Sequence, residues 1–178
     1  MEGRVHIVGY GNTQRGDDGV GPLVVQRLRS SLGPKPWLRF FLYHQLEEGL
    51  LENLGDASML ILVDASAEDT CHGVQWRKLE PRPTPSAFSH HMDPATLLWL
   101  LRLARGSCPE TWLVSIRGEN FAQGQEMSSM TLCLALRAQR EIEAFLSRIV
   151  PRDRTSWELK ASGLGVSGAM LNELLQGE

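Results

Sequence analysis

The spacing of apolar residues changes repeatedly along residues 5–150 and predicts strands that alternate with helices. Short apolar, β-branched and aromatic runs predict strands at residues 5–8, 38–43, 59–64, 73–79 and 111–116. Apolar residues three or four positions apart predict helices at residues 18–32, 48–54, 94–104 and 129–150. The run 59–64 is apolar up to its terminal acid, as in a central strand buried on both faces, and 73–79 fits an edge strand. This alternation predicts one three-layer αβα domain of the α/β class, with a mostly parallel twisted sheet of about five strands and helices on both faces.

The composition changes after Pro151. Residues 152–178 are polar and contain repeated glycines, and their apolar residues gather near the end, at Met170, Leu171, Leu174 and Leu175. We therefore expect an α/β domain over residues 1–150 and a polar tail over residues 151–178. The apolar cluster leaves room for one short helix in that tail.

Composition and charge narrow the classes of function. A chain of 178 residues, 42% of them hydrophobic, can fill one core. Its 18 Lys and Arg against 21 Asp and Glu give a net charge of −3, so no overall positive field favours nucleic acid. Apolar runs such as residues 59–63 are far shorter than the ~20 residues that span a bilayer, and no run is longer than this one, so we expect no membrane insertion. Three cysteines without CxxC spacing fit free thiols in a reducing compartment, which predicts a cytoplasmic protein.

Candidate chemical groups lie in three segments, which are the glycine-rich loop 9–21, Asp64 at the end of the central strand, and His90–His91 before the helix at residue 94. Ligands of open parallel sheets bind beyond the carboxyl ends of the strands, where these segments are expected to lie. The loop is not a dinucleotide-binding fingerprint, because Gln14 stands where the third glycine is required. Two acids, Asp17 and Asp18, also lie near the start of a helix, whose dipole keeps Asp18 ionised. Such a loop repels phosphate and attracts a cation.

Asp18, Asp64 and one of the two histidines make a plausible three-ligand set for a borderline divalent cation, with carboxylate oxygens and one imidazole nitrogen. Spacing alone leaves a plainer alternative open, in which the aspartates cap a helix or end a strand and the histidines are surface residues. Asp17 and Asp93 fit helix caps better than ligands. The remaining histidines have no partner in the pattern and are expected to be structural; they are His6, His44 and His72.

The sequence offers no good candidate for a covalent nucleophile. It has no GxSxG motif, and no cysteine lies in a glycine-rich loop or at a recognisable helix N-terminus next to a histidine. If the protein hydrolyses a bond, we expect water to be the attacking group, activated by a metal or by a carboxylate.

Three of these segments, in the same order and at the same separation, resemble the [NiFe]-hydrogenase maturation proteases. They are residues 11–21 (GNTQRGDDGVG), 60–65 (LILVDA) and 89–92 (SHHM). A fourth similarity is the strand 111–116, followed by the polar segment 117–128 before the last helix. The likeness extends over residues 4 to about 150. Residues 13–16, where the family commonly has hydrophobic residues, and the segment after Pro151 depart from it, which bears on the choice of substrate.

The resemblance implies a cytoplasmic endopeptidase that removes a C-terminal extension from the precursor of the hydrogenase large subunit, once nickel has been inserted. It implies that Asp18, Asp64 and His90 occupy the metal-contacting positions and carry the catalysis. His90 is preferred to His91 because Leu97 and Leu98 then fall where the next helix of the family packs. The resemblance also implies that the metal is nickel supplied by the substrate, and that zinc or cadmium can occupy the same place.

Two other classes of function remain open at this point. One is a self-sufficient hydrolase that carries its own zinc or manganese, which tight stoichiometric metal in the purified protein would indicate. The other is a non-catalytic module that recognises a metal-loaded partner without cutting it, which would retain that partner intact.

Overall fold

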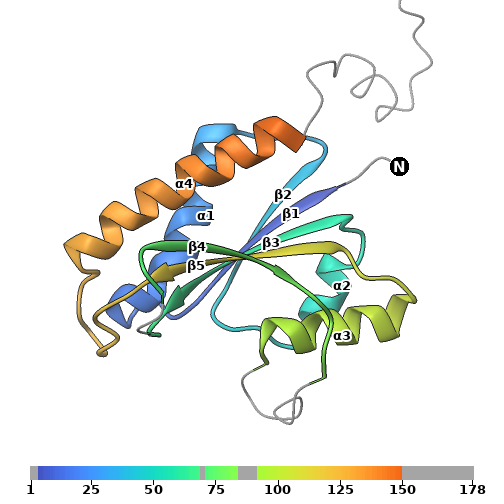
Figure 1. Cartoon of the computed structure of the whole chain (residues 1–178), viewed down its shortest axis with the longest axis horizontal. Helices are drawn as coiled ribbons and strands as arrows, with labels where there is room; N and C mark the ends of the chain where they lie inside the picture. The colour runs from blue at the N-terminus through green and yellow to red at the C-terminus, as the bar shows by residue number, and fades with distance from the viewer. Residues whose placement is uncertain (1–3, 69–70, 84–91, 150–178) are drawn as a thin grey trace, which may run out of the picture. The chain divides into compact units, whose positions relative to one another are not determined.

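The structure is a computed structural model that describes residues 4–68, 71–83 and 92–149 (Figure 1). Its elements are β1 (Val5–Tyr10), the 3-10 helix η1 (Gly16–Gly19), α1 (Val20–Leu32), β2 (Leu38–Tyr43), α2 (Leu50–Leu54), β3 (Met59–Ser66), β4 (Val74–Leu79), α3 (Pro94–Arg105), β5 (Glu110–Arg117) and α4 (Ser129–Ile149). The chain forms two compact units, residues 1–143 and 144–178, and the first holds the whole sheet. The predicted polar tail, residues 151–178, lies outside the described residues.

The sheet has five strands in the order β2-β1-β3-β5-β4. Strands β2, β1, β3 and β5 are parallel, and β4 pairs antiparallel with β5 at one edge. This arrangement confirms the predicted α/β class, the central position of the strand at residues 59–64 and the edge position of the strand at residues 73–79. The carboxyl ends of β1, β2 and β3 therefore lie next to one another at one end of the sheet.

Helices cover both faces of the sheet, with α1 and α4 on one side and α2 and α3 on the other (Figure 1). Side chains of a strand alternate between the faces, so Val8 and Leu62 pack with the leucines of α2 and α3. Their neighbours Ile7 and Ile61 are fully buried on the opposite face, toward α1. Both faces of the inner strands are thus apolar, which explains the continuous hydrophobic runs in the sequence.

Helix α1 lies unusually close to the sheet because its second residue is Gly21. A Cβ atom at that position would overlap the carbonyl oxygens of Val63 and Tyr10. The helix begins at Val20, two residues later than the earliest predicted start, and the acids Asp17 and Asp18 lie in η1 before it. Close contact between α1 and the sheet therefore holds the acid-bearing turn near the ends of β1 and β3.

The start of α3 was predicted from its sequence and is confirmed. Asp93 is the N-cap, and its Oδ1 accepts hydrogen bonds from the N–H groups of Ala95 at 2.9 Å and Thr96 at 3.3 Å. Pro94 occupies the first turn, where its missing N–H costs nothing. By contrast, α2 begins at Leu50 instead of residue 48 and is only 5 residues long. No helix among the described residues is both long and apolar enough to cross a lipid bilayer.

Candidate functional site

Two of the predicted site residues, Asp18 and Asp64, line one pocket at the carboxyl ends of the parallel strands. Asp18 comes from η1, which follows β1, and Asp64 comes from β3. The pocket, here called the acid pocket, has a volume of about 300 Å³. Its other lining residues are Tyr10, Gly11, Asn12, Arg15, His44, Gln45, Leu46 and Met92. The predicted convergence of the first loop and the central strand is therefore present in the structure.

Backbone geometry in the loop after β1 fixes the position of Asp18. The N–H of Asn12 donates a hydrogen bond of 2.8 Å to Oδ2 of Asp18. Gly11 has a φ of 135°, and a Cβ atom there would overlap the carbonyl oxygen of Asp18. Glycine at this position thus allows the loop to fold back on the acid, which lines the pocket.

Asp64 lies in surroundings that favour its protonated form. Burial raises the pKa of its carboxyl to about 7; the Tyr10 hydroxyl and the Ala65 N–H act in the opposite direction, and the charge of Asp18 raises it further. The Tyr10 side chain is only 8% exposed, and burial beside Asp64 raises the pKa of its phenol well above the usual value. Its hydroxyl has no partner with regular hydrogen-bond geometry among the described residues. A cation that binds both acids would displace the proton of Asp64.

Asp17 has a different role from its neighbour. Its carboxylate is fully buried and accepts four hydrogen bonds, from the N–H groups of Glu119, Asn120 and Ser128 and from the Ser128 hydroxyl. Burial acts to raise its pKa, but these donors outweigh burial and the pKa is lowered. Ser128 directly precedes α4, and its hydroxyl accepts a hydrogen bond from the N–H of Thr131 in the first turn of that helix. Asp17 is therefore not the helix cap that the sequence predicts, but it holds the residue that caps α4. It joins the acid-bearing turn to the loop between β5 and α4.

The described residues include His44 but neither of the two histidines that were predicted as ligands. His90 and His91 lie outside the described residues, although Met92, the next residue in the chain, lines the acid pocket. His44, which was expected to be structural, is exposed and lines the same pocket. It directly follows β2. Residues at the carboxyl ends of parallel strands are where ligands bind, and this rule, which points to Asp64, also points to His44. Within the described part of the chain, no group of three His, Cys, Asp or Glu side chains is arranged to hold a metal ion.

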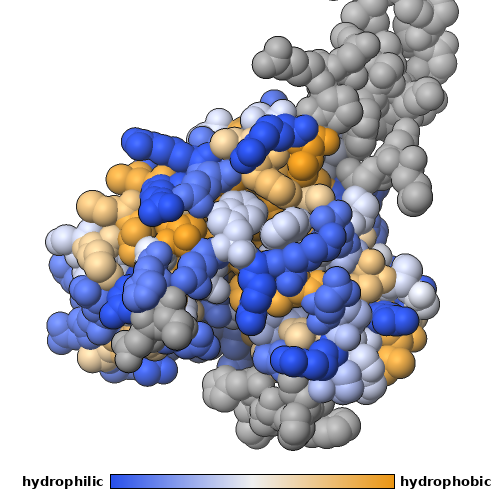
Figure 2. Space-filling model, viewed as in Figure 1, coloured by the Kyte–Doolittle hydropathy of each residue, from blue (hydrophilic) through white to orange (hydrophobic). Residues whose placement is uncertain are grey.

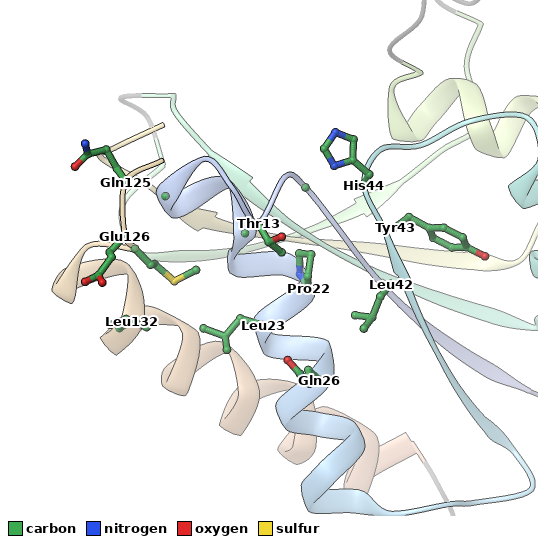
Figure 3. Close-up of a pocket in the computed structure, with 14 residues that line it drawn as sticks. Thr13, Pro22, Leu23, Gln26, Leu42, Tyr43, His44, Gln125, Glu126 and Leu132 are labelled. Carbon is green, nitrogen blue, oxygen red and sulfur yellow. The ribbon is translucent and has the colours of Figure 1, made fainter. Parts of the chain in front are cut away.

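A groove extends from each side of the acid pocket. The first, here called the polar groove, has a volume of about 900 Å³, shares Tyr10 and Asp64 with the acid pocket, and runs along β3, β4 and β5. The second, here called the apolar groove, has a volume of about 660 Å³ and shares Gly11 and His44 with the acid pocket (Figure 3). The acid pair therefore lies between two open channels, an arrangement that suits an extended chain better than a small enclosed ligand.

Comparison with solved structures identifies the class of this fold as that of the hydrogenase maturation proteases. The endopeptidase HybD from E. coli matches with a TM-score of 0.68 and 20% identity, over 85% of this chain and 99% of that one. The protease HycI from Thermococcus kodakarensis matches with a TM-score of 0.63 and 21% identity, over 81% and 90%. A hydrogenase 2 maturation peptidase from a Thaumarchaeota archaeon matches with a TM-score of 0.60 and 23% identity, over 80% and 97%. At this identity the likeness shows the fold, and no family profile and no curated protein matches the sequence.

Proposed function

We propose that the protein is a cytoplasmic endopeptidase that removes the C-terminal extension of a [NiFe]-hydrogenase large-subunit precursor after nickel insertion. The observation that carries the proposal is the meeting of Asp18 and Asp64 in one pocket, at the carboxyl ends of the strands. The fold of named hydrogenase maturation proteases supports the same reaction. The two flanking grooves support a polypeptide substrate.

Nickel is part of the substrate in this proposal. Asp18 and Asp64 supply carboxylate oxygens to it and His90 supplies an imidazole nitrogen, a donor set that suits a borderline divalent cation. Docking of nickel against these side chains displaces the proton that Asp64 holds near neutral pH. Recognition of the precursor thereby depends on its metal content. Zinc or cadmium, which accept the same donors, compete for these contacts.

Hydrolysis then uses water as the nucleophile. Two groups can activate this water, the nickel ion by polarising it or the carboxylate of Asp18 or Asp64 as a general base. In both routes the acid pocket provides the negative charge that balances the cation and accepts the proton. The peptide bond is cut only when the metal has brought the end of the precursor into the pocket.

The decisive experiment compares a nickel-loaded large-subunit precursor with its nickel-free form. We expect the purified protein to shorten only the loaded form, as measured by the C-terminal mass of the precursor. Asp18→Ala and His90→Ala are expected to abolish cleavage with the fold intact. Glu52→Ala and His72→Ala, which change exposed residues outside the pocket, serve as matched controls and are expected to cleave normally.

The other outcomes separate the alternatives. Cleavage of both precursor forms by a protein that carries tightly bound metal would indicate a self-sufficient metallohydrolase. A complex with the loaded precursor that stays uncut would indicate a binding module. Normal cleavage by Asp18→Ala or His90→Ala would overturn the assignment of the site.

A further inference from the structure

The apolar groove has leucines from three elements along its walls, and the loops after β1 and before α4 complete its lining. Leu23 from the first turn of α1 forms part of its floor, Leu132 from α4 lies on one side, and Leu42 from β2 lies on the other (Figure 3). Its volume of about 660 Å³ is within the range of sites that hold ligands. The residues come from positions 23, 42 and 132, so the fold, and not a local motif, builds this surface.

Two of these leucines are exposed and do not belong to the buried core. Leu42 is 46% exposed and Leu132 is 44% exposed. Apolar residues are also visible along α4 on the face shown in Figure 2. Apolar side chains that gather at one hollow gain free energy when another apolar surface covers them. The groove is thus suited to an apolar occupant.

The groove is continuous with the acid pocket. Gly11 and His44 line both spaces, so a chain that lies in the groove reaches the pocket at His44. A segment of protein that places one bond beside Asp18 and Asp64 can therefore place its neighbouring residues here or in the polar groove, which shares Tyr10 and Asp64 with the pocket. Of the two, only the apolar groove has exposed leucines along its walls.

The outer edge of β2 has backbone groups that can bind an extended peptide. Carbonyl groups of Trp37 and Tyr43 accept hydrogen bonds from Val5 and Gly11, so these odd-numbered residues direct their backbone groups toward β1. Backbone groups alternate along a strand, so the N–H and C=O of Leu42 point away from β1. Within the described residues no strand pairs with this edge of β2. A peptide that lies along it can add as a further strand and place a side chain against Leu42.

We infer that the apolar groove binds an extended segment of the protein substrate with apolar side chains, next to the bond that is cut. The inference rests on the proposed endopeptidase function and specifies its substrate. The segment lies along the outer edge of β2, with an apolar side chain between Leu23, Leu42 and Leu132. A precursor with charged residues in this segment is bound poorly, even when its metal is in place.

Kinetics of cleavage test the groove separately from the chemistry. Leu42→Lys and Leu132→Lys place a charge in the groove without touching the core, and we expect KM for the nickel-loaded precursor to rise about tenfold or more, with kcat nearly unchanged. Leu103→Lys is the matched control, because Leu103 is 63% exposed on α3 and lines neither groove. Normal cleavage by the wild type together with an unchanged KM in both groove variants would overturn the inference and leave the proposed function standing.

Photo-cross-linking gives a second readout that needs no cleavage. A benzophenone amino acid is placed at position 42, 132 or 103 of the full chain, with Asp18 and Asp64 unchanged, and each protein is irradiated immediately after it is mixed with the nickel-loaded precursor. We expect cross-links from positions 42 and 132 and none from position 103. The same pattern with a wild type that cuts nothing would support the groove and reject the endopeptidase. No cross-link from positions 42 and 132 would reject the groove.

Discussion

Asp17 and Asp18 are adjacent in the sequence, but their carboxylates have opposite surroundings. Asp17 is fully buried and accepts four hydrogen bonds from the loop before α4. Asp18 is partly exposed in the acid pocket, and among the described residues its carboxylate accepts one hydrogen bond, from the N–H of Asn12. One acid therefore holds the turn in place, and the other is available to a ligand.

The first prediction concerns this division of roles. Asp17→Asn replaces a carboxylate oxygen by an NH₂ group, which must face a donor because both oxygens of Asp17 accept N–H groups. We expect the free energy of unfolding, measured by urea titration, to fall by about 2–4 kcal/mol. The matched variant Asp18→Asn disturbs one bond at most and is expected to cost less than about 1 kcal/mol. Equal losses of unfolding free energy for the two variants would show that Asp17 does not hold the turn in place.

The roles of single residues were the hardest part to predict from the sequence. The partners of Asp17 are 102–111 residues away along the chain, so no local pattern distinguishes it from a helix cap. His44 has no partner in the sequence pattern, which predicts a structural role, but the parallel pairing of β2 with β1 brings it to the acid pocket. Asp64 was found because it ends a recognisable strand. Long-range pairing, which spacing does not encode, decides which polar residues meet.

At the scale of elements, the sequence predicted nearly the whole architecture. All five strands and four helices lie close to where the apolar spacing predicts them, because side chains repeat every 3.6 residues in a helix and every two in a strand. The errors are at the helix starts, at Val20 and Leu50, where a turn of other geometry precedes the helix. The distance between α1 and the sheet was not predictable, since it depends on a glycine whose neighbours come from two strands.

The second prediction concerns that approach of α1. Gly21→Ala would gain about 1 kcal/mol of helix propensity, but its Cβ would overlap backbone oxygens of Tyr10 and Val63 that cannot rotate away. We expect a net loss of about 1–3 kcal/mol in unfolding free energy, together with impaired cleavage, because α1 must move and η1 moves with it. Ser30→Ala, on the exposed side of α1, is the control and should change stability by less than about 0.5 kcal/mol. A stabilised Gly21→Ala protein would show that the helix is free to shift.

At the scale of the whole molecule, the sheet has a titratable group near each end, and burial shifts the pKa values of these two groups in opposite directions. His6, near the start of β1, is fully buried with Nε2 at 3.3 Å from Asp56, and burial lowers its pKa despite that carboxylate. Asp64, at the other end, has its pKa raised to about 7 by burial. His6 therefore stabilises the fold above the pKa of an unfolded histidine, about 6.5, and this contribution is lost as the pH falls. The contribution of Asp64 to stability has the opposite dependence on pH, and is lost as the pH rises.

The third prediction follows from the sign of the Asp64 effect. Between about pH 4 and pH 7 the folded chain holds a proton on Asp64 that the unfolded chain has released, so the contribution of Asp64 to stability falls as the pH rises. Asp64→Asn removes this dependence and keeps the size of the side chain. In the presence of a chelator, we expect the variant to match the wild type near pH 4 and to be more stable at pH 8, by no more than ~4 kcal/mol. Urea unfolding at several pH values measures the difference. A variant that is less stable than the wild type at pH 8 would show that the ionised carboxylate is stabilised in the pocket, and that a cation would have no proton to displace there.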